Sequence, residues 1–159
     1  MNQVRIIQVS TPQQYEDATL LIREYAAWLN FDLSFQNFEA EMASLPSMYN
    51  AADGGLFVAY LDDRPAGVIG LRRFKDSQGE IKRMFVKEDA RGHGIGRMLL
   101  SKCIDTAKAL NYQALKLDTT DFMKSAIKLY QEYGFVETGA YRFNPEKGAR
   151  YFELLLLSR

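Results

Sequence analysis

The chain has 159 residues, of which 47% are apolar and 25% charged. This size and composition are typical of one globular domain, and we expect a single domain over residues 1–159. Twenty basic and twenty acidic side chains cancel, so we expect neither nucleic acid nor a membrane surface as a partner. One cysteine and one histidine exclude an internal disulfide and disfavour a metal site. The sequence shows no signal peptide and no membrane-spanning stretch, so we expect a cytoplasmic protein.

The first third of the chain is predicted to hold one strand and two helices. Apolar, β-branched residues at 4–9 indicate a strand. A Thr-Pro-Gln-Gln sequence at 11–14 indicates the start of a helix, because threonine can cap it, proline fits the first turn and the second glutamine completes a capping box. Apolar residues at helical spacing continue this helix to Leu29. Ser34 can cap a second helix, which we expect to end near Leu45.

The middle of the chain is predicted to form three strands and a helix. Segments 56–61 and 66–74 flank an Asp-Asp-Arg-Pro turn at 62–65, which indicates a hairpin. Residues 80–86 indicate a third strand. Apolar residues then recur at helical spacing, so we expect a helix over 95–111.

The last third is predicted to hold a strand at 115–118, a helix at 125–133 stopped by Gly134, and a strand pair at 136–141 and 151–157. The central strand–helix–strand unit makes one pair of strands parallel, whereas the hairpins on both sides are antiparallel. The sequence therefore predicts an α/β fold with a mixed central β-sheet flanked by helices.

A glycine-rich sequence, Arg91-Gly92-His93-Gly94-Ile95-Gly96, joins the strand at 80–86 to the helix that follows. Alternate glycines let the backbone turn tightly, and the free N–H groups at the start of a helix attract anions. With Arg97 on its other side, this loop predicts a site for a phosphate or pyrophosphate. A dinucleotide fingerprint fits less well because Arg97 stands in place of a glycine, and no Gly-Lys-Ser/Thr completes a Walker loop. Glycines that serve only a tight turn remain the alternative.

Two motifs of the chain resemble those of the GCN5-related N-acetyltransferases, the GNAT family. The segment Arg91–Gly96 fits the family's R/Q-x-x-G-x-G/A acyl-CoA signature, and Ala126–Phe135 is similar to its later A-x-x-L-Y-x-x-x-G-F segment. The order of the predicted elements also fits the family over nearly the whole chain. The resemblance implies the GNAT fold and the transfer of an acetyl, or another short acyl, group from coenzyme A to a primary amine.

The resemblance also implies how acetyl-CoA is held as a cosubstrate, without a metal. The backbone amides of 92–97 would hold its pyrophosphate, and the backbone of 84–86 would pair with its pantetheine arm as a strand does. The cofactor-binding residues expected on this basis are Met84, Phe85, Val86, Arg91, Gly92, His93, Gly94, Ile95, Gly96 and Arg97.

Tyr130 and Glu80 are the catalytic residues that the resemblance implies. Tyr130 matches the tyrosine that protonates the departing thiolate in the family, and a tyrosine packed in the core is the alternative. Glu80 lies eleven residues before Arg91, as does the general-base glutamate of the family's histone acetyltransferases. A structural glutamate paired with Lys82, on the same face of the strand, remains equally open. In that case a chain of water molecules would take the proton.

The sequence defines the acceptor site less well. The loop at 45–55 and the segment Tyr141–Asn144 are candidates for its wall, and an arginine at 72, 73 or 142 is a candidate for a carboxylate contact. The aromatic candidates are Tyr25, Trp28, Phe31 and Phe35. The compact chain favours a small-molecule amine that attacks acetyl-CoA directly in a ternary complex, and a homodimer is compatible with it. Two other functions remain open: a non-catalytic acyl-CoA sensor or regulatory module with the same fold, and a nucleotide-phosphate-binding protein.

Overall fold

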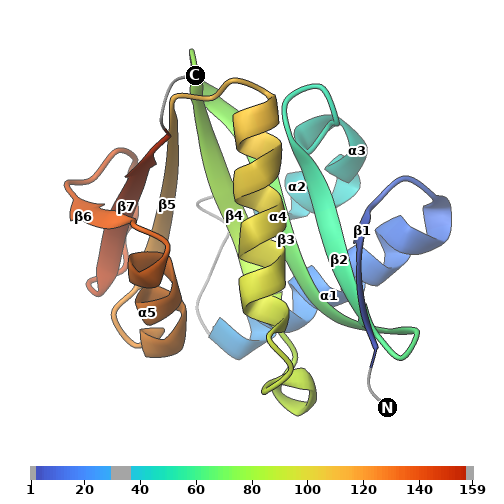
Figure 1. The fold of residues 1–159 in the computed structure, drawn as a ribbon. Coiled ribbons are helices and arrows are strands. Elements are labelled where there is room, and N and C mark those ends of the chain that lie inside the picture. Colours follow the sequence, from blue (N-terminus) through green and yellow to red (C-terminus); the bar gives the residue numbers. More distant parts are fainter. Residues whose placement is uncertain (1–2, 30–36, 157–159) are drawn as a thin grey trace.

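The computed structural model describes residues 3–29 and 37–156 (Figure 1). The strands are β1 (Val4–Gln8), β2 (Gly55–Leu61), β3 (Arg64–Lys75), β4 (Gln78–Val86), β5 (Ala114–Thr120), β6 (Val136–Thr138) and β7 (Ala149–Leu155). The helices are α1 (Pro12–Leu29), α2 (Phe38–Ala43), α3 (Leu45–Met48), α4 (Ile95–Ala109) and α5 (Lys124–Glu132). Three residues singled out in the sequence, Phe31, Ser34 and Phe35, lie outside the described residues.

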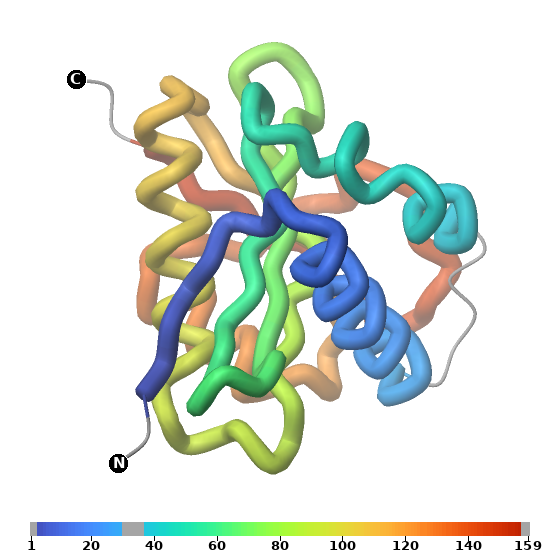
Figure 2. Tube along the Cα trace, turned by 90° about the vertical axis from the view of Figure 1, so that its right-hand side faces the viewer, coloured from blue at the N-terminus to red at the C-terminus, as the bar shows by residue number. Residues whose placement is uncertain are grey.

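The strands form one mixed sheet in the order β1-β2-β3-β4-β5-β7-β6. All neighbouring strands are antiparallel except β4 and β5, which run parallel. Helices α4 and α5 cover one face, and α1 to α3 cover the other; Figure 2 shows α4 and α1 on opposite sides of the sheet. The predicted mixed sheet flanked by helices is confirmed. Within the described parts of the chain, no helix is both long and apolar enough to cross a membrane.

Alternating side chains of β2 fill two apolar cores, one on each face of the sheet. Phe57 and Ala59 share a core with α4, whereas Val58 and Tyr60 share one with α1. All residues of β2 are buried, as expected for a strand covered on both faces. Because apolar burial contributes roughly 25 cal/mol per Å², these two cores stabilise the packing of the helices on both faces of the sheet.

The parallel strands β4 and β5 pair only at their beginnings, Gln78–Glu80 with Ala114–Lys116. After this point β4 carries one extra residue relative to β3, and Arg83 adopts a left-handed conformation with φ of 61°. A bulge of this kind bends the strand that contains it. An opening therefore forms between β4 and β5, and it holds the cavities described below.

Two predicted segments have different lengths in the structure. In place of one second helix there are two short ones, because Pro46 lacks an N–H group and begins a new helical turn in α3. Strand β6 ends at Thr138 rather than Tyr141, because the Tyr141 side chain turns toward β4 and bonds to Glu80. Residues 139–148, between β6 and β7, form an irregular segment that we call the strap.

Candidate active site

Two adjacent cavities lie in the opening between β4 and β5. The larger one, the cofactor groove, has a volume of about 540 Å³ and reaches the beginnings of α4 and α5. The smaller one, the inner pocket, has a volume of about 40 Å³ and lies between the diverging strands. Met84 and Met123 line both cavities. The predicted cofactor residues that line the groove are Met84, Phe85, Val86, Arg91, Gly92, Gly94, Ile95, Gly96 and Arg97. His93 does not line it; its Nδ1 lies 3.1 Å from the carbonyl oxygen of Ala90.

The loop before α4 has the geometry of an anion site. Gly92 and Gly94 adopt φ of 89° and 74°, which glycine tolerates best. A Cβ atom added at either position would meet nothing within 4 Å, so open space lies beside this backbone. The first hydrogen bond within α4 runs from the N–H of Met98 to the carbonyl of Gly94, which leaves the N–H groups of 95–97 without partners in the helix. These donors and the positive end of the helix dipole fit a pyrophosphate.

The edge of β4 that faces the groove is available for an extended ligand. Beyond Glu80 this edge is not paired with β5, and Met84, Phe85 and Val86 line the groove along it. Main-chain groups of an unpaired strand edge can bond to an extended ligand as they do to a neighbouring strand. The arrangement fits the pantetheine arm that the resemblance implies.

Aromatic and charged side chains surround the mouth of the groove. The rings of Trp28 in α1 and Phe122 after β5 lie 5.8 Å apart, and both are partly exposed. The guanidinium of Arg91 lies 5.8 Å from the centre of the Trp28 ring. Arg97 forms an ion pair with Glu132 at 2.5 Å. Both arginines are therefore held at the place where the anionic part of a cofactor would lie.

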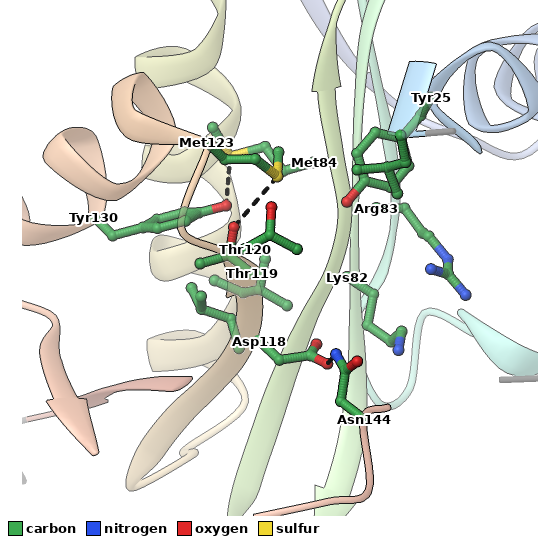
Figure 3. Close-up of a pocket in the computed structure, with 13 residues that line it drawn as sticks. Tyr25, Lys82, Arg83, Met84, Asp118, Thr119, Thr120, Met123, Tyr130 and Asn144 are labelled. Atoms are coloured by element: carbon green, nitrogen blue, oxygen red, sulfur yellow. Dashed lines mark hydrogen bonds between the residues drawn. The ribbon is translucent and has the colours of Figure 1, made fainter. Parts of the chain in front are cut away.

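Tyr130 in α5 lies at the wall of the inner pocket, and its hydroxyl points into the opening (Figure 3). The hydroxyl donates a hydrogen bond to the sulfur of Met84 at 3.7 Å. Its ring packs against Phe135 and Phe152. Burial raises the pKa of Tyr130 above its ordinary value, so the phenol keeps its proton at neutral pH. The two interpretations of Tyr130 are thus compatible: the ring belongs to the core and the hydroxyl faces the cavity.

Glu80 lies at the last position of β4 that pairs with β5, and it is fully buried. Its carboxylate accepts hydrogen bonds from the Tyr141 hydroxyl and from Arg142, each at 2.7 Å. The Nε of Arg72 lies 3.3 Å from the same carboxylate. Glu80 does not line the inner pocket. The carboxylate thus attaches the strap to β4.

The whole-chain comparisons agree with this geometry. The chain matches the model of the Acetyltransferase (GNAT) family over residues 22–135. It is 31% identical to an uncharacterized N-acetyltransferase of Schizosaccharomyces pombe, with 95% of this chain and 94% of that protein covered. It is 30% identical to an uncharacterized N-acetyltransferase of Dictyostelium discoideum, with 86% and 92% covered. The chain belongs to the GNAT acetyltransferase family.

Two further similarities were found, one to a solved structure and one to a human protein. The crystal structure of a GNAT-family acetyltransferase from Staphylococcus aureus Mu50 superposes with a TM-score of 0.81 at 24% identity, covering 98% of this chain and all of that one. The chain is also 36% identical to human N-acetylaspartate synthetase. That alignment covers 63% of this chain and 34% of the human protein. The family, the fold and the class of N-acetyltransferase are thus as predicted.

Three charged residues that sequence analysis did not assign to the site line the inner pocket of this acetyltransferase: Lys82, Arg83 and Asp118. Asp118 in β5 accepts a hydrogen bond from the side-chain amide of Asn144 in the strap, at 3.1 Å. Lys82 in β4 is 7% exposed and lines the same pocket. Burial lowers the pKa of Lys82 to about 8, while the carboxylates of Glu80 and Asp118 oppose the shift. For Asp118, the available signal was the alternation of side chains along β5. It places Lys116 and Asp118 on one face of the strand and Leu117 on the other.

A buried ion pair supports the bulge of the acetyltransferase from behind. Arg83 donates two hydrogen bonds to Glu41 of α2, at 2.9 and 3.0 Å, and the Tyr49 hydroxyl donates a third at 2.9 Å. Burial alone would raise the pKa of Glu41, but the bonds and charge of Arg83 hold it below its ordinary value. The pair thus connects α2 to the bulge, with both charges compensated in the buried interior.

Proposed function

We propose that this protein transfers an acetyl group from acetyl-CoA to the primary amine of a small molecule, with both substrates bound at once. The observation that carries the proposal is that the two cavities adjoin, sharing Met84 and Met123 as lining residues beside the hydroxyl of Tyr130. A donor in the groove and an acceptor in the pocket would come together at this point. Direct transfer needs no covalent enzyme intermediate, so the chain has only to bind, orient and handle protons.

The residues of the groove fit acetyl-CoA, which supplies the activated acetyl thioester. The N–H groups at the start of α4 and the side chains of Arg91 and Arg97 would bind the pyrophosphate. The unpaired edge of β4 from Met84 to Val86 would bond to the pantetheine arm. This arrangement directs the reactive end toward the inner pocket.

Tyr130 is the residue that we propose as the proton donor to the departing thiolate. Its hydroxyl faces the junction of the two cavities and already donates to a sulfur atom, that of Met84. Since its pKa is raised by burial, it is in the protonated form that a donor needs.

Glu80 has two candidate roles, and its geometry favours one of them. As a general base it would have to release Tyr141 or Arg142 before it could accept a proton from the amine. As a positioning residue it holds the strap, whose Asn144 in turn holds Asp118 in the inner pocket. We propose the positioning role, with water taking the proton from the amine.

A small-molecule acceptor is supported by the size of the inner pocket and by one relative. A cavity of about 40 Å³ has room for the reacting end of an amine and a few neighbouring atoms. N-acetylaspartate synthetase, which matches 63% of this chain, is named for an N-acetylated amino acid. Both observations favour a compact acceptor.

Release of free thiol from acetyl-CoA in the presence of a panel of amines tests the proposal. We expect amine-dependent thiol release and intersecting lines when both substrates are varied, which indicate a ternary complex. Binding of acetyl-CoA, measured by thermal stabilisation, without thiol release for any amine would instead indicate the sensor or regulatory module. Stabilisation by ATP but not by coenzyme A would indicate a nucleotide-binding protein.

A further inference from the structure

Two hydroxyl groups of the inner pocket have no hydrogen-bond partner among the described residues. One belongs to Tyr25 of α1, and the other belongs to Thr120, the last residue of β5. Thr120 is 6% exposed, and its hydroxyl oxygen is buried. Because buried polar groups nearly always have a partner, these two hydroxyl groups are candidates for contact with a bound molecule.

Tyr25 and Thr120 approach the pocket from different sides. Figure 3 shows Tyr25 on the α1 side, with its hydroxyl directed toward the pocket, and Thr120 on the β5 side. The Tyr25 ring packs against Phe85, with the ring centres 5.7 Å apart. Strand alternation places Thr120 on the same face of β5 as Asp118. A small group that enters the pocket would therefore have one hydroxyl on each side.

Both hydroxyl groups lie near the proposed proton donor. Tyr25, Thr120 and Tyr130 line the same cavity of about 40 Å³, which has room for about three water-sized groups. The phenol of Tyr25 also contributes to the raised pKa of Tyr130, after the larger effect of burial. A nitrogen bound between Tyr25 and Thr120 would thus be close to the thiolate that departs from the donor.

The charged groups of the pocket interact with one another and with neighbouring residues. Asp118 accepts a hydrogen bond from Asn144 at 3.1 Å, and Lys82 lies in the field of the Glu80 and Asp118 carboxylates. Burial raises the pKa of Tyr25 to about 12, so its hydroxyl is uncharged at neutral pH, as every threonine hydroxyl is. The two hydroxyl groups therefore offer neutral acceptors, which suit the uncharged amine that attacks a thioester.

We propose that Tyr25 and Thr120 bind the reacting nitrogen of the acceptor, each hydroxyl oxygen accepting one N–H of a neutral primary amine. This inference rests on the proposed acetyltransferase function and assigns the residues that recognise the nitrogen. With both N–H groups bonded, the lone pair is free to attack the acetyl carbon. The carbon–nitrogen bond forms, the carbon–sulfur bond breaks, and the thiolate takes the proton of Tyr130. One N–H proton then leaves the nitrogen and restores Tyr130 through water.

Matched acceptors test the assignment: each primary amine is compared with its N-methyl derivative, which has one N–H group fewer. We expect the wild-type protein to prefer the primary amine by at least about tenfold in kcat/KM, because a secondary amine leaves one hydroxyl without a partner. Thr120→Val and Tyr25→Phe keep the shape of the side chain and remove its hydroxyl. Each should lower kcat/KM for the primary amine by about three- to tenfold. The N-methyl amine should lose less, because its single N–H can bond to the remaining hydroxyl.

Three further comparisons separate this role from a structural one. Neither substitution breaks a hydrogen bond recorded among the described residues, so unfolding free energy and stabilisation by acetyl-CoA should stay as in the wild type. Thr120→Ser keeps the hydroxyl and should retain most of the activity. Thr106→Val in α4 and Tyr15→Phe in α1 lie outside both cavities and are the matched controls, which should show wild-type kinetics.

The outcomes distinguish this inference from the proposed function. A preference that stays unchanged in both variants would show that the methyl group is excluded by its size, and would overturn this inference alone. Equal losses for primary and N-methyl amines would also overturn it, because the hydroxyl groups would then contact something other than the nitrogen. If one variant fails to fold, the other decides by the same comparison. Absence of turnover with every amine would overturn the proposed function as well.

Discussion

The hydroxyl of Tyr130 is one atom on a side chain that otherwise packs in the core. Phenylalanine keeps the ring contacts to Phe135 and Phe152 and removes the only proton that the side chain can donate. Tyr130→Phe should therefore fold normally and bind acetyl-CoA, but turnover should fall by about ten- to a thousandfold. The loss should shrink with an acyl donor whose thiol has a lower pKa. Steady-state rates together with thermal stabilisation by acetyl-CoA measure both effects.

Tyr112→Phe is a better control than a change at the neighbouring Tyr133. The Tyr133 hydroxyl bonds to the Arg97 carbonyl at the start of α4, so its removal could disturb the groove. Tyr112 is equally buried and bonds to the Asp53 carbonyl, outside both cavities. Loss of this hydrogen bond should lower the free energy of unfolding by about 1 kcal/mol and leave turnover unchanged. If Tyr130→Phe turns over as fast as the wild type under conditions where the chemical step limits the rate, then another group donates the proton.

Glu80→Gln separates the two roles of this carboxylate. Glutamine can still accept the Tyr141 hydroxyl, but it no longer compensates Arg142 and Arg72. In the positioning role, the strap loosens and KM for the amine rises by about tenfold, with no recovery at high pH. Arg142→Met breaks the same pair and should reproduce this behaviour. A hundredfold fall in kcat that high pH restores, seen for Glu80→Gln but not for Arg142→Met, would establish Glu80 as the base.

At the scale of one element, the start of α4 carries the anion site. Gly94→Val places a β-branched side chain at φ of 74° and fills the open space beside the loop. We expect it to abolish most of the stabilisation by acetyl-CoA, about 2.7 kcal/mol at a hundredfold excess over the dissociation constant. Unfolding curves with and without acetyl-CoA measure the difference.

Gly139→Val controls for the volume of the added side chain. Gly139 also has open space around it, but it lies in the strap, away from the groove. This variant should keep the full stabilisation by acetyl-CoA. If a folded Gly94→Val protein is stabilised as much as the wild type, the α4 loop does not bind the cofactor.

The order of the elements and the anion loop follow from sequence patterns, because both are local. A strand, three alternate glycines and an amphipathic helix occupy consecutive residues, so their meeting needs no knowledge of the rest of the fold. The bulge at Arg83 is different: it breaks the alternation of β4 and directs Lys82 and Arg83 toward one pocket. The burial and pairing of Glu41 could not be predicted either, because its partner Arg83 lies 42 residues away in the sequence. Distant pairs of this kind define the inner pocket.

At the scale of the whole molecule, the Glu41–Arg83 pair connects α2 to the centre of the sheet. Both side chains are almost fully buried, so Arg83→Met leaves an uncompensated carboxylate and should cost about 3–5 kcal/mol. The double variant Glu41→Leu, Arg83→Met removes both charges and should recover most of that loss. Denaturant unfolding of the single and double variants gives the coupling energy. Equal losses of unfolding free energy in the single and the double variant would show that packing, rather than charge, determines stability at this pair.

The same pair predicts the acid limit of stability. The pKa of Glu41 is lowered in the folded protein, so its contribution is complete above the unfolded value of about 4.3 and is lost as the pH falls through the folded value. Wild-type stability should thus decrease at acid pH more steeply than that of the double variant. Unfolding free energies between about pH 3 and pH 6 test this; parallel curves would contradict it.

Trp28 is the only tryptophan of the chain, and it stands at the mouth of the groove between Phe122 and Arg91. The protein therefore carries its single indole at the place where its cosubstrate is expected to enter. Excitation at wavelengths that indole absorbs and tyrosine does not therefore reports on the groove. A ligand that draws Arg91 away from the ring changes the emission, so binding can be followed optically in the unlabelled protein, before any acetyl group is transferred.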